Sequence, residues 1–154
     1  MPVRRIAPNV QGVDRRVAVV LSRFNPEVGE RLLEGALRAL REAKVKDDDV
    51  LVVTVSGALE TPLALQRLAQ TGDYDALVAL GAVVRGETYH FEIVANQSAS
   101  GVSSVALEFG IPVGNGILTT DTDAQALERA ASKGYDAAQA ALELATLLDA
   151  IDEE

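Results

Sequence analysis

The 154-residue sequence contains no cysteine and no tryptophan, and its aromatic residues are three tyrosines and three phenylalanines. The lack of cysteine excludes disulfide bonds, thiolate nucleophiles and cysteine-based zinc sites. No apolar run approaches the about 20 residues that a membrane-spanning helix needs. The N-terminal "MPVRRIAPNVQG" has arginines but no apolar core behind them, unlike a secretory signal. These absences favour a cytosolic protein that has no membrane partner.

Positive charge is also scarce, because the formal net charge is −9. A nucleic-acid surface needs clustered lysine and arginine, so the charge balance argues against DNA or RNA as a partner. A small phosphorylated substrate remains compatible, since it needs only a few cations and backbone N–H groups. The acidic stretch at 46–50 and the acidic C-terminus are typical of solvated turns and tails, and we expect no metal site.

Strand-like and helix-like segments alternate along the sequence. The length fits a single domain over residues 1–154. Apolar, β-branched runs predict strands at 16–22, 50–56, 75–84 and 111–119. Helical periodicity predicts helices at 26–43, 61–70, 88–109 and 122–151, the last one interrupted near Gly134. This order predicts an α/β fold, a parallel sheet with helices on both faces.

Several residue pairs indicate where helices begin. Asn25 is expected to cap the helix that opens with a proline, and Thr61 to cap the helix with Pro62 at its first position. Thr122 followed by Gln125 three residues later forms a capping-box pattern.

Residues 1–14 fall outside the alternating pattern. Two interpretations stay open for this segment. It is either a disordered terminus, or an extended segment that adds to the sheet edge of a neighbouring subunit.

Polar residues collect where the predicted strands end. In open α/β sheets, ligands bind beyond the carboxyl ends of the strands. The segments that follow these ends are 22–25, 57–62, 85–90 and 115–120, and they contain glycine, carboxylate, hydroxyl, imidazole and aromatic groups. Their convergence at one edge of the sheet predicts a binding site.

The segment "RGETYH" at 85–90 combines a helix start with the only histidine of the chain. Gly86 allows the backbone to approach a ligand, and the free N–H groups of Glu87 and Thr88 favour an anion such as phosphate. An ordinary helix start capped by Thr88 would use the same residues. His90 can transfer protons at neutral pH, or it is a surface histidine without a task.

Three further residues are candidates with equally plain alternatives. Phe24 could stack on a flat ligand or only cover the following helix. Glu60 could bind a polyhydroxyl or amine group or only complement a helix dipole. Arg129 could pair with a phosphate or be an idle surface arginine.

Four stretches together resemble the 6,7-dimethyl-8-ribityllumazine synthase family: "SRFN", "GALETP", "LGAVVRGETYHFEIV" and "GNGILTTDTDAQALERA". The resemblance spans residues 16–150, in order and spacing, and "RGETYHF" is its most specific part. It implies a flavodoxin-like three-layer αβα sandwich with a four-stranded parallel sheet. It also implies the condensation of 5-amino-6-(D-ribitylamino)uracil with 3,4-dihydroxy-2-butanone 4-phosphate, without cofactor or metal, as the penultimate step of riboflavin biosynthesis.

The resemblance assigns roles to residues of this chain. His90 would transfer protons. The ribitylaminouracil would be bound by Phe24, Ala58, Leu59, Glu60, Ala82, Val83, Val84 and Asn115. The butanone phosphate would be bound by Gly86, Glu87, Thr88 and Arg129, with Lys133 as a further candidate cation.

Three departures from the family pattern concern this site and the assembly. Leu59 stands where many members have an aromatic residue, and Asn115 where many have a phenylalanine from the adjacent subunit. The stretch 129–134 is shorter than the corresponding loop of many members, which favours an isolated pentamer over a 60-subunit capsid, and a decamer stays open as well. The resemblance implies active sites between subunits of this homo-oligomer and makes riboflavin synthase a candidate partner.

Two other classes of function compete with this enzyme. A non-catalytic flavin or lumazine binder would keep Phe24 and Glu60 but would not need the imidazole of His90. A phosphoryl-accepting receiver domain would need an acidic residue after the third strand, where this chain has Arg85.

Overall fold

Four parallel strands form the centre of the molecule, which is described by a computed structural model over residues 2–154. Residue 1, the first of the predicted N-terminal segment, lies outside the described residues. The strands are β1 (Val17–Ser22), β2 (Val50–Val55), β3 (Ala76–Val84) and β4 (Val113–Thr120). They lie in the order β2-β1-β3-β4 and all pairs are parallel, which confirms the predicted sheet.

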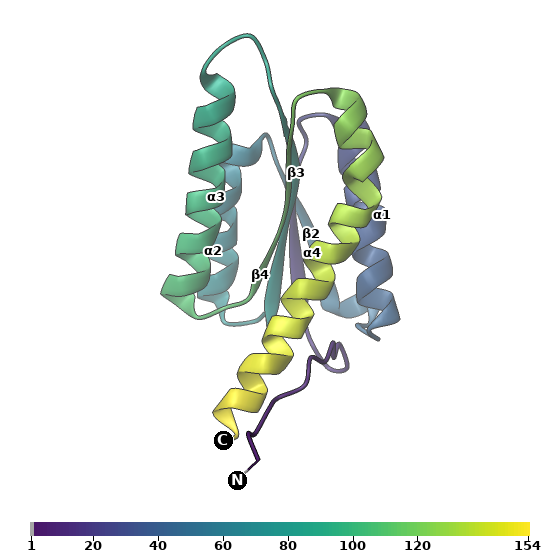
Figure 1. Ribbon diagram of the computed structural model, residues 1–154, viewed down its shortest axis with the longest axis vertical. Helices are drawn as coiled ribbons and strands as arrows, with labels where there is room; N and C mark the ends of the chain where they lie inside the picture. The colour runs from purple at the N-terminus through teal and green to yellow at the C-terminus, as the bar shows by residue number, and fades with distance from the viewer. Residues whose placement is uncertain (1) are drawn as a thin grey trace.

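The helices cover both faces of this sheet. They are α1 (Pro26–Glu42), α2 (Thr61–Thr71), α3 (His90–Phe109) and α4 (Asp123–Asp152). Figure 1 shows α2 and α3 on one side of the strands and α1 and α4 on the other. Two short 3₁₀ helices, η1 (Asp47–Asp49) and η2 (Ala58–Glu60), precede β2 and α2. The flavodoxin-like three-layer prediction is confirmed.

The core lies on both faces of the central strands. Every residue of β1 is buried, and so is every residue of β3 except the last. Such continuous apolar runs are expected of parallel strands covered on two sides. Strand β2 is different, because it forms an edge of the sheet and leaves Leu51 and Val52 exposed.

Of the three predicted helix caps, one is wrong and one lacks its side-chain bond. Asn25 occupies the N-cap position of α1 as expected, but it adopts a left-handed conformation (φ 61°) and its side-chain amide donates to Asp123 Oδ1 at 3.1 Å instead of bonding to its own helix. Thr61 is the first residue of α2 and not its cap, because Glu60 occupies that position. The capping box of α4 is confirmed, since the Gln125 N–H donates to Thr122 Oγ1 at 3.1 Å.

Helix α4 is continuous, so the predicted interruption near Gly134 is wrong. The glycine instead permits close packing of two helices. A Cβ atom on Gly134 would lie 2.8 Å from the carbonyl carbon of Leu32 in α1. Strand β4 also begins two residues later than predicted, because the Ile111 N–H bonds to Ala106 O at the end of α3.

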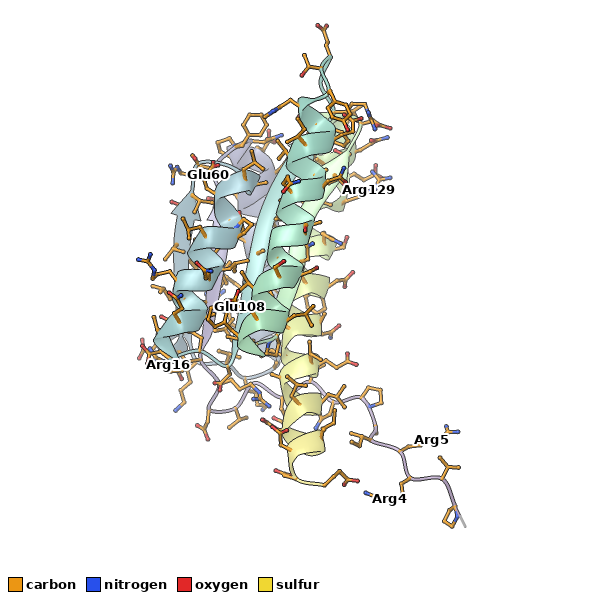
Figure 2. The ribbon with its side chains drawn as sticks, turned by 90° about the vertical axis from the view of Figure 1, so that its left-hand side faces the viewer. Arg4, Arg5, Arg16, Glu60, Glu108 and Arg129 are labelled. Atoms are coloured by element: carbon orange, nitrogen blue, oxygen red, sulfur yellow. The ribbon has the colours of Figure 1, made fainter. Side chains whose placement is uncertain are left out.

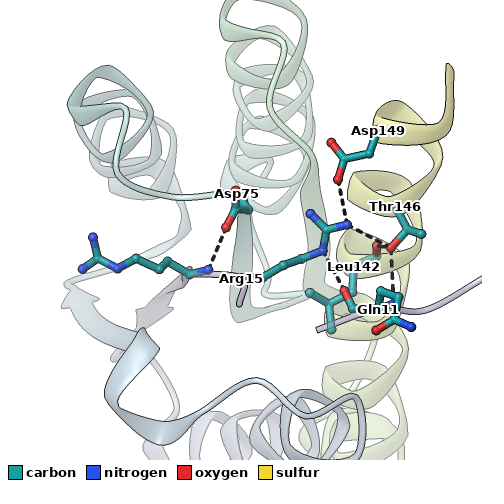
Figure 3. A network of polar contacts seen from close by, with 7 residues as sticks. Gln11, Arg15, Asp75, Leu142, Thr146 and Asp149 are labelled. Carbon is teal, nitrogen blue, oxygen red and sulfur yellow. Dashed lines mark hydrogen bonds and ion pairs between the residues drawn. The ribbon is translucent and has the colours of Figure 1, made fainter. Parts of the chain in front are cut away.

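The N-terminal segment is extended and lies along the end of its own α4, near the C-terminus (Figure 1). Arg15 connects the two, as Figure 3 shows: it donates to Gln11 O at 2.7 Å and to Asp149 Oδ2 at 3.0 Å. The Gln11 N–H donates to Thr146 Oγ1 at 3.2 Å. Whether the segment also reaches a neighbouring subunit stays a prediction.

Over residues 2–154, no helix is both long and apolar enough to cross a lipid bilayer.

Candidate active site

A cleft of about 240 Å³ opens at the carboxyl ends of the strands, between the start of α2 and the start of α3. It gathers segments that are far apart in the sequence. Its lining residues are Phe24, Gly57, Ala58, Leu59, Glu60, Ala82, Val83, Val84, Gly86, Thr88, His90, Phe91 and Val94. Most of the predicted site residues therefore lie in one cavity, and the exceptions are Glu87, Asn115, Arg129 and Lys133.

The cleft has an apolar floor and one ordered carboxylate. The floor is the end of β3, where the side chains of Ala82 and Val83 are buried. Glu60 stands at the rim, where the hydroxyl of Ser56 donates to its Oε1 at 2.6 Å. Phe24 is 62% exposed although it belongs to the cleft wall, so its ring is available to a ligand.

The loop between β3 and α3 places the histidine at the mouth of the cleft. Helix α3 begins at His90, two residues later than predicted, and Tyr89 occupies the cap position without a side-chain bond. The His90 N–H donates to Thr88 Oγ1 at 3.4 Å. A Cβ atom on Gly86 would meet nothing within 4 Å, so the backbone there is open to the cleft. An exposed helix start favours an anionic ligand.

Arg85 links this loop to the start of α4. Its Nε donates to Asp121 Oδ1 and its Nη1 donates to Glu92 Oε1, both at 2.8 Å. Its guanidinium lies 4.5 Å from the centre of the Phe91 ring. The pKa of Arg85 is raised, first by the hydrogen bond to Asp121 and then by that to Glu92. Arg85 is thus permanently charged and engaged within the chain.

A second hollow of about 520 Å³ lies beside the cleft and contains the two predicted phosphate cations, Arg129 and Lys133. Arg129 is held on the first turns of α4, where its Nη1 donates to Gln125 O at 3.1 Å. Figure 2 shows Glu60 and Arg129 at the same end of the molecule but on either side of α3. Phe91 lines both cavities. Within one chain, the predicted cations therefore do not share a cavity with His90.

Two predicted residues line neither cavity. Asn115 is exposed on β4, the edge strand opposite β2, and its Oδ1 accepts the N–H of Ile117 at 3.0 Å. Glu87 is exposed in the loop before α3. Within one chain, neither residue takes part in a cavity with His90.

The cleft also includes residues that the sequence did not single out, namely Gly57, Phe91 and Val94. Helical spacing could have indicated Val94, because it follows His90 by four residues and lies on the same face of α3. In the described part of the chain, no group of three or more histidine, aspartate and glutamate side chains is placed to hold a metal ion.

This geometry suits the orientation of a flat polar ligand next to a proton-transfer group. The apolar floor and the exposed Phe24 ring can sandwich a heteroaromatic ring, and Glu60 can accept its hydrogen bonds. His90 stands at the opening where an anion would meet the α3 start.

Comparison with known proteins agrees with this arrangement. The family model described as 6,7-dimethyl-8-ribityllumazine synthase matches residues 14–149. A protein of that name from Paraburkholderia phymatum is 52% identical over 99% of this chain and 89% of its own length. Another from Cupriavidus pinatubonensis is 55% identical over 94% of this chain and 86% of its own length. One from Nitrosospira multiformis is 52% identical over 98% of this chain and 94% of its own length.

Proposed function

The chain belongs to the 6,7-dimethyl-8-ribityllumazine synthase family, and we propose how its two cavities carry out the family's reaction. The enzyme condenses 5-amino-6-(D-ribitylamino)uracil with 3,4-dihydroxy-2-butanone 4-phosphate and releases phosphate and water. It is a transferase of riboflavin biosynthesis. The roles of individual residues below are our proposal for this chain.

The cleft binds the ribitylaminouracil. Phe24 stacks on the pyrimidine ring, because it is the one aromatic face at the rim that is largely exposed. The floor of Ala82, Val83 and Val84 supports the opposite side, and Ala58, Leu59 and Glu60 bind the ring edge and the ribityl hydroxyls. The hydrogen bond from Ser56 supports this role for Glu60, since it fixes the carboxylate before the ligand arrives.

The phosphate of the butanone binds at the opening between β3 and α3. Gly86, Glu87 and Thr88 supply backbone groups there, and Arg129 and Lys133 supply positive charge. Because Arg129 lies in the second hollow of its own chain, the hollow of one subunit faces the cleft of the next. Asn115, which lines neither cavity, contributes to the neighbouring site in the same way. This arrangement repeats head to tail and closes as a ring, for which we propose a pentamer.

The reaction requires the protein only to orient the two substrates and to transfer protons. The amine of the pyrimidine attacks the ketone carbon, and loss of water gives an imine. Loss of phosphate and ring closure with loss of water then complete the second ring. No electron acceptor is consumed, so the reaction requires no redox cofactor. The protein holds the two substrates together, and the His90 imidazole takes and returns protons at the amine, the carbinol and the carbon next to the imine.

The observation that carries this proposal is the convergence of Phe24, Glu60 and His90 on one cleft. Mixing the pure protein with both substrates tests it through the absorbance and fluorescence of the lumazine product. A protein that binds the product tightly but does not form it would instead be a non-catalytic lumazine binder. Native mass measurement in the same buffer distinguishes a pentamer from a decamer or a 60-subunit shell.

The exposed edge of β2 supports a role for the N-terminal segment in this ring. Leu51 and Val52 are 40% and 37% exposed on a strand with one unpaired side. We place the part of a neighbouring subunit's N-terminal segment that precedes Val10 along that edge, because Gln11 and Gly12 are already bonded to their own chain. Removal of residues 1–10 would then shift the native mass from pentamer towards monomer. A cytoplasmic location and an encounter with riboflavin synthase, which uses the product, complete the proposal.

A further inference from the structure

Arg85 lies where the two cavities of one chain meet. It lines the second hollow, and it stacks on Phe91, which lines both the hollow and the cleft. Its backbone N–H also bonds to Thr120 O at 2.8 Å, so the residue is fixed at the end of the sheet. The side chain then spans from Glu92, in the first turn of α3, to Asp121, two residues before α4 begins.

The contacts continue from Asp121 to the predicted phosphate cation. The Asp121 N–H donates to Gln125 Oε1 at 2.9 Å, within the capping box that starts α4. The carbonyl oxygen of Gln125 in turn accepts a hydrogen bond from Arg129 Nη1 at 3.1 Å. An unbroken series of polar contacts thus joins the helix start that carries His90 to the helix start that carries Arg129.

We propose that Arg85 is a positioning residue for lumazine formation, which holds the start of α3 and the start of α4 in one fixed relation. It does so through two carboxylates and one aromatic ring, and it does not bind the substrate phosphate itself. The proposal rests on the proposed function, because it assumes that His90 and Arg129 serve the reaction.

The alternative role for Arg85 is that of a third phosphate cation beside Arg129 and Lys133. The geometry argues against this, since the guanidinium already donates to two carboxylates, from Nε to Asp121 and from Nη1 to Glu92, each at 2.8 Å. A guanidinium fork matches two acceptors at fixed angles, which a lysine ammonium cannot reproduce. A cation that is neutralised by two carboxylates attracts a phosphate weakly, whereas a rigid fork orients the elements that it joins.

The two roles predict opposite effects for the carboxylates. Asp121→Asn and Glu92→Gln keep the size of each side chain but remove a negative charge from the neighbourhood of the phosphate. If Arg85 were a phosphate cation, either substitution would free it and improve binding of the butanone phosphate. If Arg85 positions the helix starts, either substitution weakens the fork and lowers the rate.

The test measures steady-state kinetics with both substrates for Arg85→Lys, Asp121→Asn and Glu92→Gln, together with equilibrium binding of ribitylaminouracil alone. We expect kcat/KM for the butanone phosphate to fall about tenfold in Arg85→Lys, because misplaced groups lose effective concentration. In Asp121→Asn and Glu92→Gln, kcat/KM for the butanone phosphate should also fall. In all three variants, the binding of ribitylaminouracil, the melting temperature and the native mass should equal those of the wild type.

Arg41 provides a matched control at another part of the molecule. Its Nε donates to Asp47 Oδ1 at 3.0 Å between exposed side chains, as the Arg85 Nε does to Asp121. Arg41→Lys leaves both kcat and KM unchanged. Wild-type kinetics in Arg85→Lys, or tighter binding of the butanone phosphate by Asp121→Asn, would overturn the positioning role. An equal loss of pyrimidine binding and melting temperature would overturn it as well. Failure of the proposed function is separate, because the wild-type protein would then form no lumazine.

Discussion

Gly101 in α3 packs directly against Pro62 in α2, and a Cβ atom on the glycine would lie 2.6 Å from the proline Cβ. Pro62 is the second residue of its helix and follows Glu60 and Thr61 closely in the chain. The contact therefore sets how near the Glu60 side of the cleft stands to the helix that begins with His90. A glycine in the middle of one helix thus controls the width of the cleft.

Gly101→Ala is expected to lower both stability and activity. Alanine in place of a helical glycine normally favours the helix by up to about 1 kcal/mol, but here the added methyl group must push α2 away. We expect a net loss of about 1–3 kcal/mol in the free energy of unfolding, measured with urea, and weaker pyrimidine binding. Gly29→Ala in α1 is the matched control, because its Cβ would lie 3.4 Å from Leu21 Cδ1. A stabilised and active Gly101→Ala would contradict this reading of the contact.

Gly134→Ala tests the packing of the other helical layer. The new methyl group would overlap the backbone of Leu32 in α1, which cannot move without displacing the core. Overpacking of this kind destabilises by about 1–3 kcal/mol, which denaturant unfolding measures. Ser132→Ala, an exposed position two residues earlier, should unfold like the wild type. Equal stability of the two variants would show that the helices separate easily.

These glycines mark what the sequence could and could not predict about the fold. The apolar, β-branched runs predicted all four strands, and in β1 and β3 this signal reflects nearly continuous burial on both faces. Gly134 was interpreted as a helix interruption, because local propensity cannot show that another helix approaches it. The same applies to Asn25, which holds the N-cap position of α1 but whose side chain bonds to Asp123, a residue distant in sequence, and not to its own helix.

His90→Gln tests the proton-transfer role. Glutamine keeps the polarity and the approximate size of the side chain at the start of α3 but cannot take up a proton at neutral pH. We expect kcat to fall by well over tenfold, with the native mass and the binding of ribitylaminouracil unchanged. Lumazine formation at the wild-type rate would reduce His90 to a surface residue and leave proximity as the source of catalysis.

Phe24→Leu and Arg129→Ala should separate the two substrate sites. Because ring stacking is lost, Phe24→Leu should bind ribitylaminouracil about tenfold more weakly. The KM for the butanone phosphate should stay constant. Arg129→Ala should raise the KM for the butanone phosphate and leave the binding of ribitylaminouracil unchanged, because it removes a cation from the phosphate site and does not alter the cleft. Titration of each substrate at saturation of the other gives both constants. The same substrate affected in both variants would show that the assignment is wrong.

The candidate site was predictable to the extent that it depends on strand ends. Convergence of Phe24, Glu60 and His90 follows from a parallel sheet, whose carboxyl ends meet at one edge. The separation of Arg129 from that cleft could not be predicted from the order of strands alone. It depends on the position of α3 between the two cavities and on the face of the sheet that α4 covers. Nor did the sequence indicate the double engagement of Arg85, which was considered only as an argument against a receiver domain.

The central claim is that the cleft of one subunit works with the hollow of the next. The most direct test mixes His90→Ala and Arg129→Ala subunits by joint unfolding and refolding, with native mass to verify mixed rings. At a butanone phosphate concentration well below the KM of Arg129→Ala, each variant alone should form little lumazine. Random mixing in equal amounts should restore about one quarter of the sites, where an intact His90 meets an intact Arg129. Mixed rings that remain as inactive as either parent would contradict the claim.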